Sequence, residues 1–128
     1  MTEIIHAELS HSIMDSAYNV YNRLGVDHQE KIFHRAMAID FKKKQIKYER
    51  EKTIKLYYEG EYIGEYRLDF IVENKVIVEL KVCLYPQKIH IKQVLDYLNA
   101  TGLDLAILIF FTRDGVKYKR VVNSKKSK

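Results

Sequence analysis

Two acidic side chains and one basic side chain stand at spacings that suit hydrolysis at a metal ion. In Glu79-Leu80-Lys81 a carboxylate and an ammonium group lie two residues apart, so on a β-strand both project from the same face. An isolated pair of this kind is better explained as an ion pair on a half-exposed sheet. Asp69, in the preceding predicted strand, favours a functional interpretation because it supplies a second carboxylate that can face Glu79.

The register between the two strands decides whether Asp69 and Glu79 meet. A three-residue turn over residues 73–75 places Asp69 opposite Glu79, whereas a two-residue turn places it opposite Val78, among apolar side chains. The three-residue turn keeps the apolar residues on one face, and Asn74 tolerates the left-handed conformation that such turns require. We therefore expect both carboxylates to lie side by side.

Two carboxylates in this arrangement repel each other unless a cation lies between them. Oxygen ligands with open positions suit Mg²⁺, or Mn²⁺, which bind through one or two carboxylates together with water and substrate phosphate. Such an ion lowers the pKa of a bound water and neutralises charge on a phosphodiester under attack. Lys81 would then steady the attacking hydroxide or the charge that develops on the phosphoryl group.

The elements that must position these side chains follow from the periodicity of apolar residues. A 3.6-residue period predicts helices over about residues 3–23, 28–44 and 88–100, the first and last ended by Gly25 and Gly102. A two-residue period or a continuous apolar run predicts strands over about residues 46–58, 61–72, 75–83, 105–111 and 116–122.

The order of these elements is ααβββαββ. The first three strands should form an antiparallel meander, and the crossover helix after the third strand should make the third and fourth strands parallel. This predicts an α/β fold with a mixed sheet of about five strands flanked by helices. We expect a single domain over residues 1–122 and a basic C-terminal tail over residues 123–128.

Further segments extend the pattern over most of the chain and make it resemble a known family. The matching segments are, in order, Leu24-Gly25, Glu30–Phe33, Tyr66–Val72, Val76–Lys81, the residues His90, Gln93 and Tyr97-Leu98, and Ala106–Phe110. Together they resemble the GxxExxY family of small proteins, which belongs to the PD-(D/E)xK nuclease superfamily. The resemblance covers about residues 4–122 and implies a restriction-endonuclease-like core.

The chain departs from the helix motif that gives this family its name. Asp27 stands at the motif glycine, Phe33 at the motif tyrosine, and His28-Gln29 at a usually apolar pair. Glu30 keeps its place and has two interpretations. It can complete a capping box with Asp27 as the N-cap residue, or, as the resemblance implies, it can be a third acidic ligand of the metal ion.

The third predicted helix carries polar side chains beside its apolar stripe. His90, Gln93 and Tyr97 fall at relative positions 0, 3 and 7, on a polar stripe next to the apolar one. The superfamily often has a glutamine here that points at the site, so the resemblance implies that Gln93 positions substrate or water. His90 either contacts phosphate or is an ordinary, partly exposed polar residue, and for Tyr97 as for His90 the ordinary interpretation is preferred.

Composition limits the class of protein. Apolar residues make up 47% of the 128 residues, and the net charge is +5, which fits a globular domain with a nucleic-acid partner. Lys81, His90, Lys117, Lys119 and Arg120 are the candidate contacts to nucleic acid. The basic C-terminal residues are equally compatible with a solvated tail.

The same composition favours a cytoplasmic protein. The single cysteine excludes an internal disulfide, and the sequence has neither a signal-peptide pattern nor an apolar run long enough to cross a membrane.

The preferred function is metal-dependent hydrolysis of DNA or RNA, with Asp69, Glu79 and Glu30 as metal ligands. Lys81 and Gln93 complete the predicted catalytic set. Two alternatives stay open: a non-catalytic module that binds nucleic acid or protein, and a junction-resolving endonuclease that acts as a homodimer.

Overall fold

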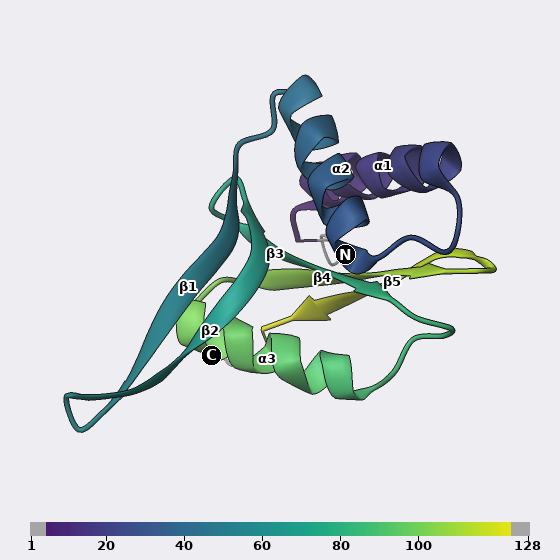
Figure 1. The fold of residues 1–128 in the computed structure, drawn as a ribbon. Helices are drawn as coiled ribbons and strands as arrows, with labels where there is room; N and C mark the ends of the chain where they lie inside the picture. Colours follow the sequence, from purple (N-terminus) through teal and green to yellow (C-terminus); the bar gives the residue numbers. More distant parts are fainter. Residues whose placement is uncertain (1–4, 124–128) are drawn as a thin grey trace, which may run out of the picture.

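Five segments with alternating or continuous apolar side chains form one mixed sheet in the computed structural model, which describes residues 5–123 (Figure 1). In sheet order they are β1 (Tyr48–Tyr58), β2 (Glu61–Val72), β3 (Val76–Val82), β4 (Leu105–Thr112) and β5 (Gly115–Val122). The helices are α1 (Ala7–Leu24), α2 (Glu30–Lys43) and α3 (Ile89–Thr101). The predicted order of elements is confirmed.

The pairing of the strands also follows the prediction. Strands β1, β2 and β3 form an antiparallel meander. Helix α3 then carries the chain across one face of the sheet, so that β4 runs parallel to β3, and β5 returns antiparallel to β4. The site residues of β3 therefore lie on the central strand of the sheet.

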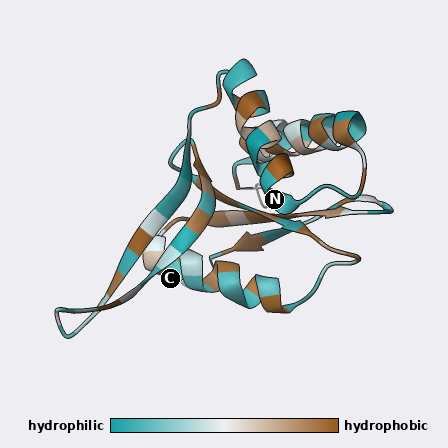
Figure 2. Ribbon diagram, in the orientation of Figure 1, coloured by the Kyte–Doolittle hydropathy of each residue, from teal (hydrophilic) through white to brown (hydrophobic). Residues whose placement is uncertain are grey.

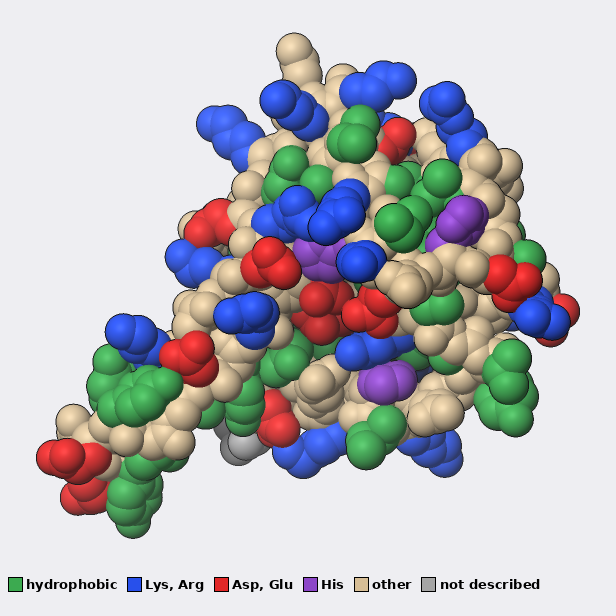
Figure 3. All heavy atoms as spheres, in the orientation of Figure 1, with side chains coloured by type: hydrophobic (Ala, Val, Ile, Leu, Met, Phe, Trp, Pro, Cys, Tyr) green, Lys and Arg blue, Asp and Glu red, His purple; other side chains and the backbone are tan. Residues whose placement is uncertain are grey.

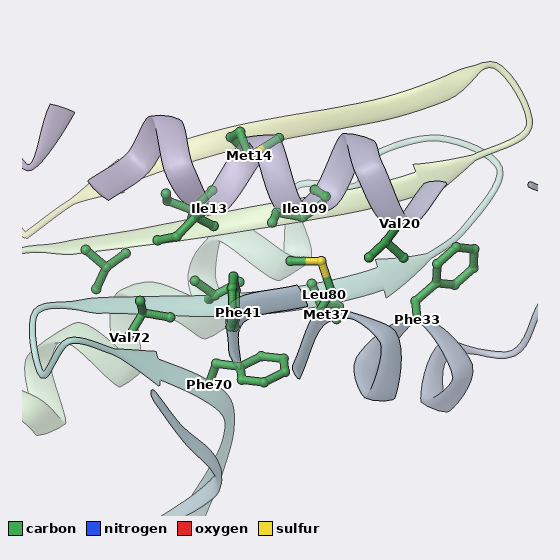
Figure 4. Close-up of a cluster of buried hydrophobic side chains, with 14 of the residues drawn as sticks. Ile13, Met14, Val20, Phe33, Met37, Phe41, Phe70, Val72, Leu80 and Ile109 are labelled. Atoms are coloured by element: carbon green, nitrogen blue, oxygen red, sulfur yellow. The ribbon is translucent and has the colours of Figure 1, made fainter. Parts of the chain in front are cut away.

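Helices cover both faces of the sheet and make two cores. The pair α1 and α2 packs on one face and α3 on the other (Figure 1). Side chains of Met37, Phe41, Phe70 and Leu80 meet in the larger core (Figure 4). Because both faces are covered, every residue of β4 is buried. Both helix layers alternate apolar and polar residues around their axes (Figure 2).

The turn between β2 and β3 has the predicted register. Val72 pairs with Val76 across a turn in which Glu73 and Asn74 have φ angles of 52° and 56°. An asparagine in this left-handed conformation is common because its short polar side chain can hydrogen-bond locally. The result is that Asp69 and Glu79 are equidistant from the turn and face each other.

The predicted capping box at the start of α2 is wrong. The N-cap residue is Gln29, which makes no side-chain cap hydrogen bond. Asp27 instead accepts a hydrogen bond of 3.1 Å from Nη2 of Arg113 in the β4–β5 turn. The Asp27 carboxylate is therefore paired with Arg113 and does not cap α2, so Glu30 has no capping-box partner.

The C-terminal end of the described chain bears on the predicted basic tail over residues 123–128. Asn123 is buried and its side chain donates to the carbonyl oxygens of Leu98 and Leu103. The remainder of the predicted basic tail, residues 124–128, lies outside the described residues.

Within residues 5–123, none of the helices has the length and apolar character needed to span a membrane.

Candidate active site

Backbone pairing between β2 and β3 ends immediately before the two acidic residues. The last ladder pair is Phe70 with Val78. Beyond it, the side chains take over the hydrogen bonds: Oε2 of Glu79 accepts the backbone N–H of Asp69 at 2.6 Å, and Oδ2 of Asp69 accepts the backbone N–H of Leu80 at 2.8 Å. Each carboxylate is thus fixed by the opposite strand, with its second oxygen left for another partner.

Glu79 is held in an environment that disfavours its negative charge. The residue is only 3% exposed. Burial and, next, the nearby charge of Asp69 raise the pKa of Glu79 from 4.5 to about 8, although the Asp69 N–H and Lys81 act in the opposite direction. A divalent cation beside the two carboxylates would remove this cost, so the electrostatics of the pair fit a metal site.

This environment predicts how stability changes with pH. Without divalent cations, the free energy of unfolding should fall as pH rises from about 4.5 to about 8, because folded Glu79 holds its proton over this range and the unfolded chain does not. Urea unfolding at several pH values measures this slope. Glu79→Gln should flatten it, and so should saturating Mg²⁺. An equal slope in wild type and Glu79→Gln would contradict the assignment.

Glu30 and Lys81 lie close enough to Asp69 and Glu79 for electrostatic interaction. Burial raises the pKa of Glu30, whereas Lys81 lowers it and Asp69 raises it. Lys81 also acts on Glu79. Nevertheless, Lys81 forms no direct ion pair with any residue in the described part of the chain. Its ammonium group remains available to a negatively charged ligand.

Helix α3 packs on the face of the sheet opposite to Val78 and Leu80, the face to which Glu79 and Lys81 belong by the alternation of β3. Burial and, next, the charge of Lys81 lower the pKa of His90. Burial and, next, the charges of Glu79 and Asp69 raise the pKa of Tyr97 to about 12. Both side chains therefore lie within electrostatic reach of the β3 residues, as the predicted stripe on this helix requires.

Gln93, on the same stripe, carries a buried Oε1 atom that has no hydrogen-bond partner within the described residues. An acceptor in this state destabilises the fold, and a water or ligand in the site would satisfy it. Gln93→Leu should therefore raise the free energy of unfolding by about 1 kcal/mol and lower cleavage. Urea unfolding and a cleavage assay on the same samples measure both. A destabilised variant with full activity would contradict this role.

The chain also places side chains near Asp69 that sequence analysis did not select. A cleft of about 260 Å³ opens between α2 and the β1–β2 strands. Its lining residues are Glu30, Lys31, His34, Arg35, Arg50, Glu51 and Asp69. Acidic, histidine and basic side chains gather in this region between the helix pair and the sheet (Figure 3). The spacing of four residues between Glu30 and His34 on one helix was the available signal.

The three predicted basic contacts on β5 have different surroundings. Lys81 is level with Phe110 on β4, which is level with Lys117 on β5. Lys117 and Lys119 are exposed. Arg120 instead donates to the carbonyl oxygen of Ile5 and lines a pocket against α1, so it is outside the candidate site.

The donor set suits a hard divalent ion bound through few protein ligands. No three His, Cys, Asp or Glu side chains between residues 5 and 123 are grouped so as to enclose a metal. Mg²⁺ needs no such cage, because it keeps several waters and binds through one or two carboxylates and substrate phosphate. Asp69 and Glu79 meet that requirement, and Glu30 stands nearby as a third candidate.

Comparisons with known proteins identify the family of this chain and show similar folds among solved structures. The family model described as the PD-(D/E)XK nuclease superfamily matches residues 7–121. No curated protein matches the chain. Among solved structures, SSO0001 is similar with a TM-score of 0.60 at 20% identity, and the match covers 91% of this chain but 58% of that one. An alkaline exonuclease (LHK-Exo) from Laribacter hongkongensis is similar with a TM-score of 0.55 at 14% identity over 99% of this chain and 74% of that one.

Proposed function

Because this chain belongs to the PD-(D/E)XK nuclease superfamily, we propose that it hydrolyses phosphodiester bonds of nucleic acid with the help of Mg²⁺, or of Mn²⁺ in its place. One observation carries the proposal. Asp69 and Glu79 are held side by side where the pairing of β2 and β3 ends, and each uses only one carboxylate oxygen for the backbone hydrogen bond to the opposite strand. Lys81 stands next to them and forms no ion pair with the residues that the structure describes. The finer assignment to the GxxExxY family is part of this proposal.

The residues have distinct roles in the proposed reaction. Asp69 and Glu79 would hold the ion, with Glu30 as a third ligand directly or through water. The bound ion would supply a more acidic water and neutralise phosphate charge. Lys81 would stabilise the negative charge that develops on the phosphoryl oxygens. Gln93 would accept a hydrogen bond from the water or the substrate through its Oε1, which has no hydrogen-bond partner among residues 5–123.

The surface charge supports a nucleic-acid substrate held through its backbone. The net charge of +5 favours a polyanion. Lys81, Phe110 and Lys117 lie side by side on the neighbouring strands β3, β4 and β5. The ring of His90 lies 6.1 Å from that of Phe110, so His90 is close to the same three residues. Lys119 extends the exposed basic edge along β5. Contacts of this kind position a duplex or single strand without reading its sequence.

The proposal is tested with plasmid DNA, single-stranded DNA, RNA and a four-way junction, each incubated with the wild-type chain and Mg²⁺ or Mn²⁺. Metal-dependent cleavage of any of them supports it. Salt-dependent binding without cleavage under all metals would favour the non-catalytic module. Cleavage confined to the junction, together with a dimeric mass by light scattering, would favour the resolvase.

A further inference from the structure

His34 is placed against the candidate metal ligand Asp69 by contacts on both sides of its ring. The residue lies on α2, one turn after Glu30, and is 7% exposed. Its ring stacks on Phe70 with centroids 4.5 Å apart. Nε2 faces Oδ1 of Asp69 at 3.6 Å, and Nδ1 accepts a hydrogen bond of 3.1 Å from Nε of Arg50.

The contact with Arg50 determines which ring nitrogen of His34 carries hydrogen. A guanidinium group can only donate, so Nδ1 must offer its lone pair. In that tautomer the hydrogen is on Nε2, the atom that faces Asp69. The imidazole is thereby a donor toward the carboxylate and has no free nitrogen with which to bind a metal ion at that position.

Asp69 needs such support because β2 loses its backbone pairing there on both sides. Toward β3 the ladder ends at Phe70. Toward β1 the pairing passes from Arg50–Phe70 to Lys52–Leu68 without a pair at Asp69. Glu51, which would stand opposite Asp69, has a φ of 52°, a conformation that a glutamate adopts at a cost. Side-chain contacts must therefore replace the missing ladder.

We propose that Arg50 and His34 act together as positioning residues for Asp69. Arg50 sets the tautomer of His34, and the Nε2–H of His34 steadies Oδ1, the oxygen that the Leu80 N–H leaves for the ion. Outer partners of this kind orient a ligand and tune its affinity for metal. In this arrangement His34 offers the ion no nitrogen ligand, so the ion is left to the carboxylate oxygens, which suits Mg²⁺ and Mn²⁺. This inference rests on the proposed metal site.

Two substitutions at His34 separate positioning from packing. His34→Phe keeps a ring that can stack on Phe70 but removes the N–H donor, whereas His34→Gln removes the ring and keeps an amide N–H donor. Positioning predicts that Mg²⁺ or Mn²⁺ affinity, measured by calorimetry, falls about 10- to 100-fold in His34→Phe and is largely retained in His34→Gln. A purely structural ring predicts the reverse order, and that result would overturn the inference.

Nitrogen-15 NMR of the wild-type chain reads the tautomer directly. In wild type the hydrogen of His34 should be on Nε2, and Arg50→Met should abolish this single tautomer. Arg113→Met, the matched control at an exposed arginine, should leave the tautomer unchanged. Hydrogen on Nδ1 in wild type would overturn the inference.

Calorimetry also keeps this inference apart from the proposed nuclease function. A chain that binds Mg²⁺ with the predicted ranking of variants but cleaves no nucleic acid would leave the inference standing and remove the proposed activity. A wild-type chain that binds neither ion would overturn both.

Discussion

Asp69→Asn is expected to lower cleavage by a factor on the order of 10³ while leaving the fold intact. The backbone N–H of Leu80 requires an oxygen acceptor, so the amide oxygen of asparagine should face Leu80. The amide nitrogen then replaces Oδ1 on the side of the metal site. An amide nitrogen is a donor and cannot bind a cation. Initial rates of plasmid nicking with Mg²⁺ measure the loss.

A matched control for this substitution is Asp96→Asn, which removes a carboxylate from the exposed ion pair with Lys92 on α3. Its cleavage rate should stay close to that of wild type, because exposed ion pairs contribute little to stability and Asp96 is no part of the candidate site. Circular dichroism should show the same helix and strand content in all three proteins. Nicking by Asp69→Asn within a few-fold of wild type would contradict its role as a ligand.

Lys81→Met is expected to lower kcat by about 10²- to 10³-fold without weakening metal binding. The change keeps an unbranched side chain on β3 and removes the ammonium group, which has no ion-pair partner in the described structure. Because Lys81 lowers the pKa values of Glu30 and Glu79, its loss should leave those carboxylates at least as attractive to a cation. Single-turnover cleavage and calorimetry separate the two effects.

Lys75→Met provides the control for this second prediction. Lys75 is exposed in the β2–β3 turn, so the substitution makes the same change of charge away from the site. It should leave kcat and metal affinity unchanged. If Lys81→Met lost metal binding and activity together, Lys81 would be a structural support of the carboxylates rather than a group that acts on substrate.

The register of β2 and β3 could be predicted because a one-residue slip would have moved Asp69 among apolar side chains. The same reasoning placed β4 in the interior, since its continuous apolar run requires cover on both faces. Gly25 and Gly102 were correctly predicted to end α1 and α3. Each of these features depends on local pattern, which the sequence displays directly.

The features that could not be predicted depend on contacts between residues far apart in the sequence. The missing backbone pair at Asp69 toward β1, and the end of the pairing toward β3, do not change the alternation pattern, so the hydrogen bonds to Glu79 and Leu80 could not be foreseen. His34 follows Glu30 by four residues in the predicted helix, but only the packing of α2 over β2 brings it to Asp69. The contact of Asp27 with Arg113 joins residues far apart in the sequence, so the local capping pattern could not reveal it either.

The central claim is that Asp69 and Glu79 together hold a divalent metal ion. Calorimetric titration of Mg²⁺ and Mn²⁺ into wild type and into the double variant Asp69→Asn, Glu79→Gln tests it most directly. Each substitution keeps an oxygen for the backbone hydrogen bond that its carboxylate now accepts, so the variant should fold. We predict saturable binding by wild type and none by the variant. Equal binding by the two proteins, or none by wild type up to several millimolar, would contradict the account.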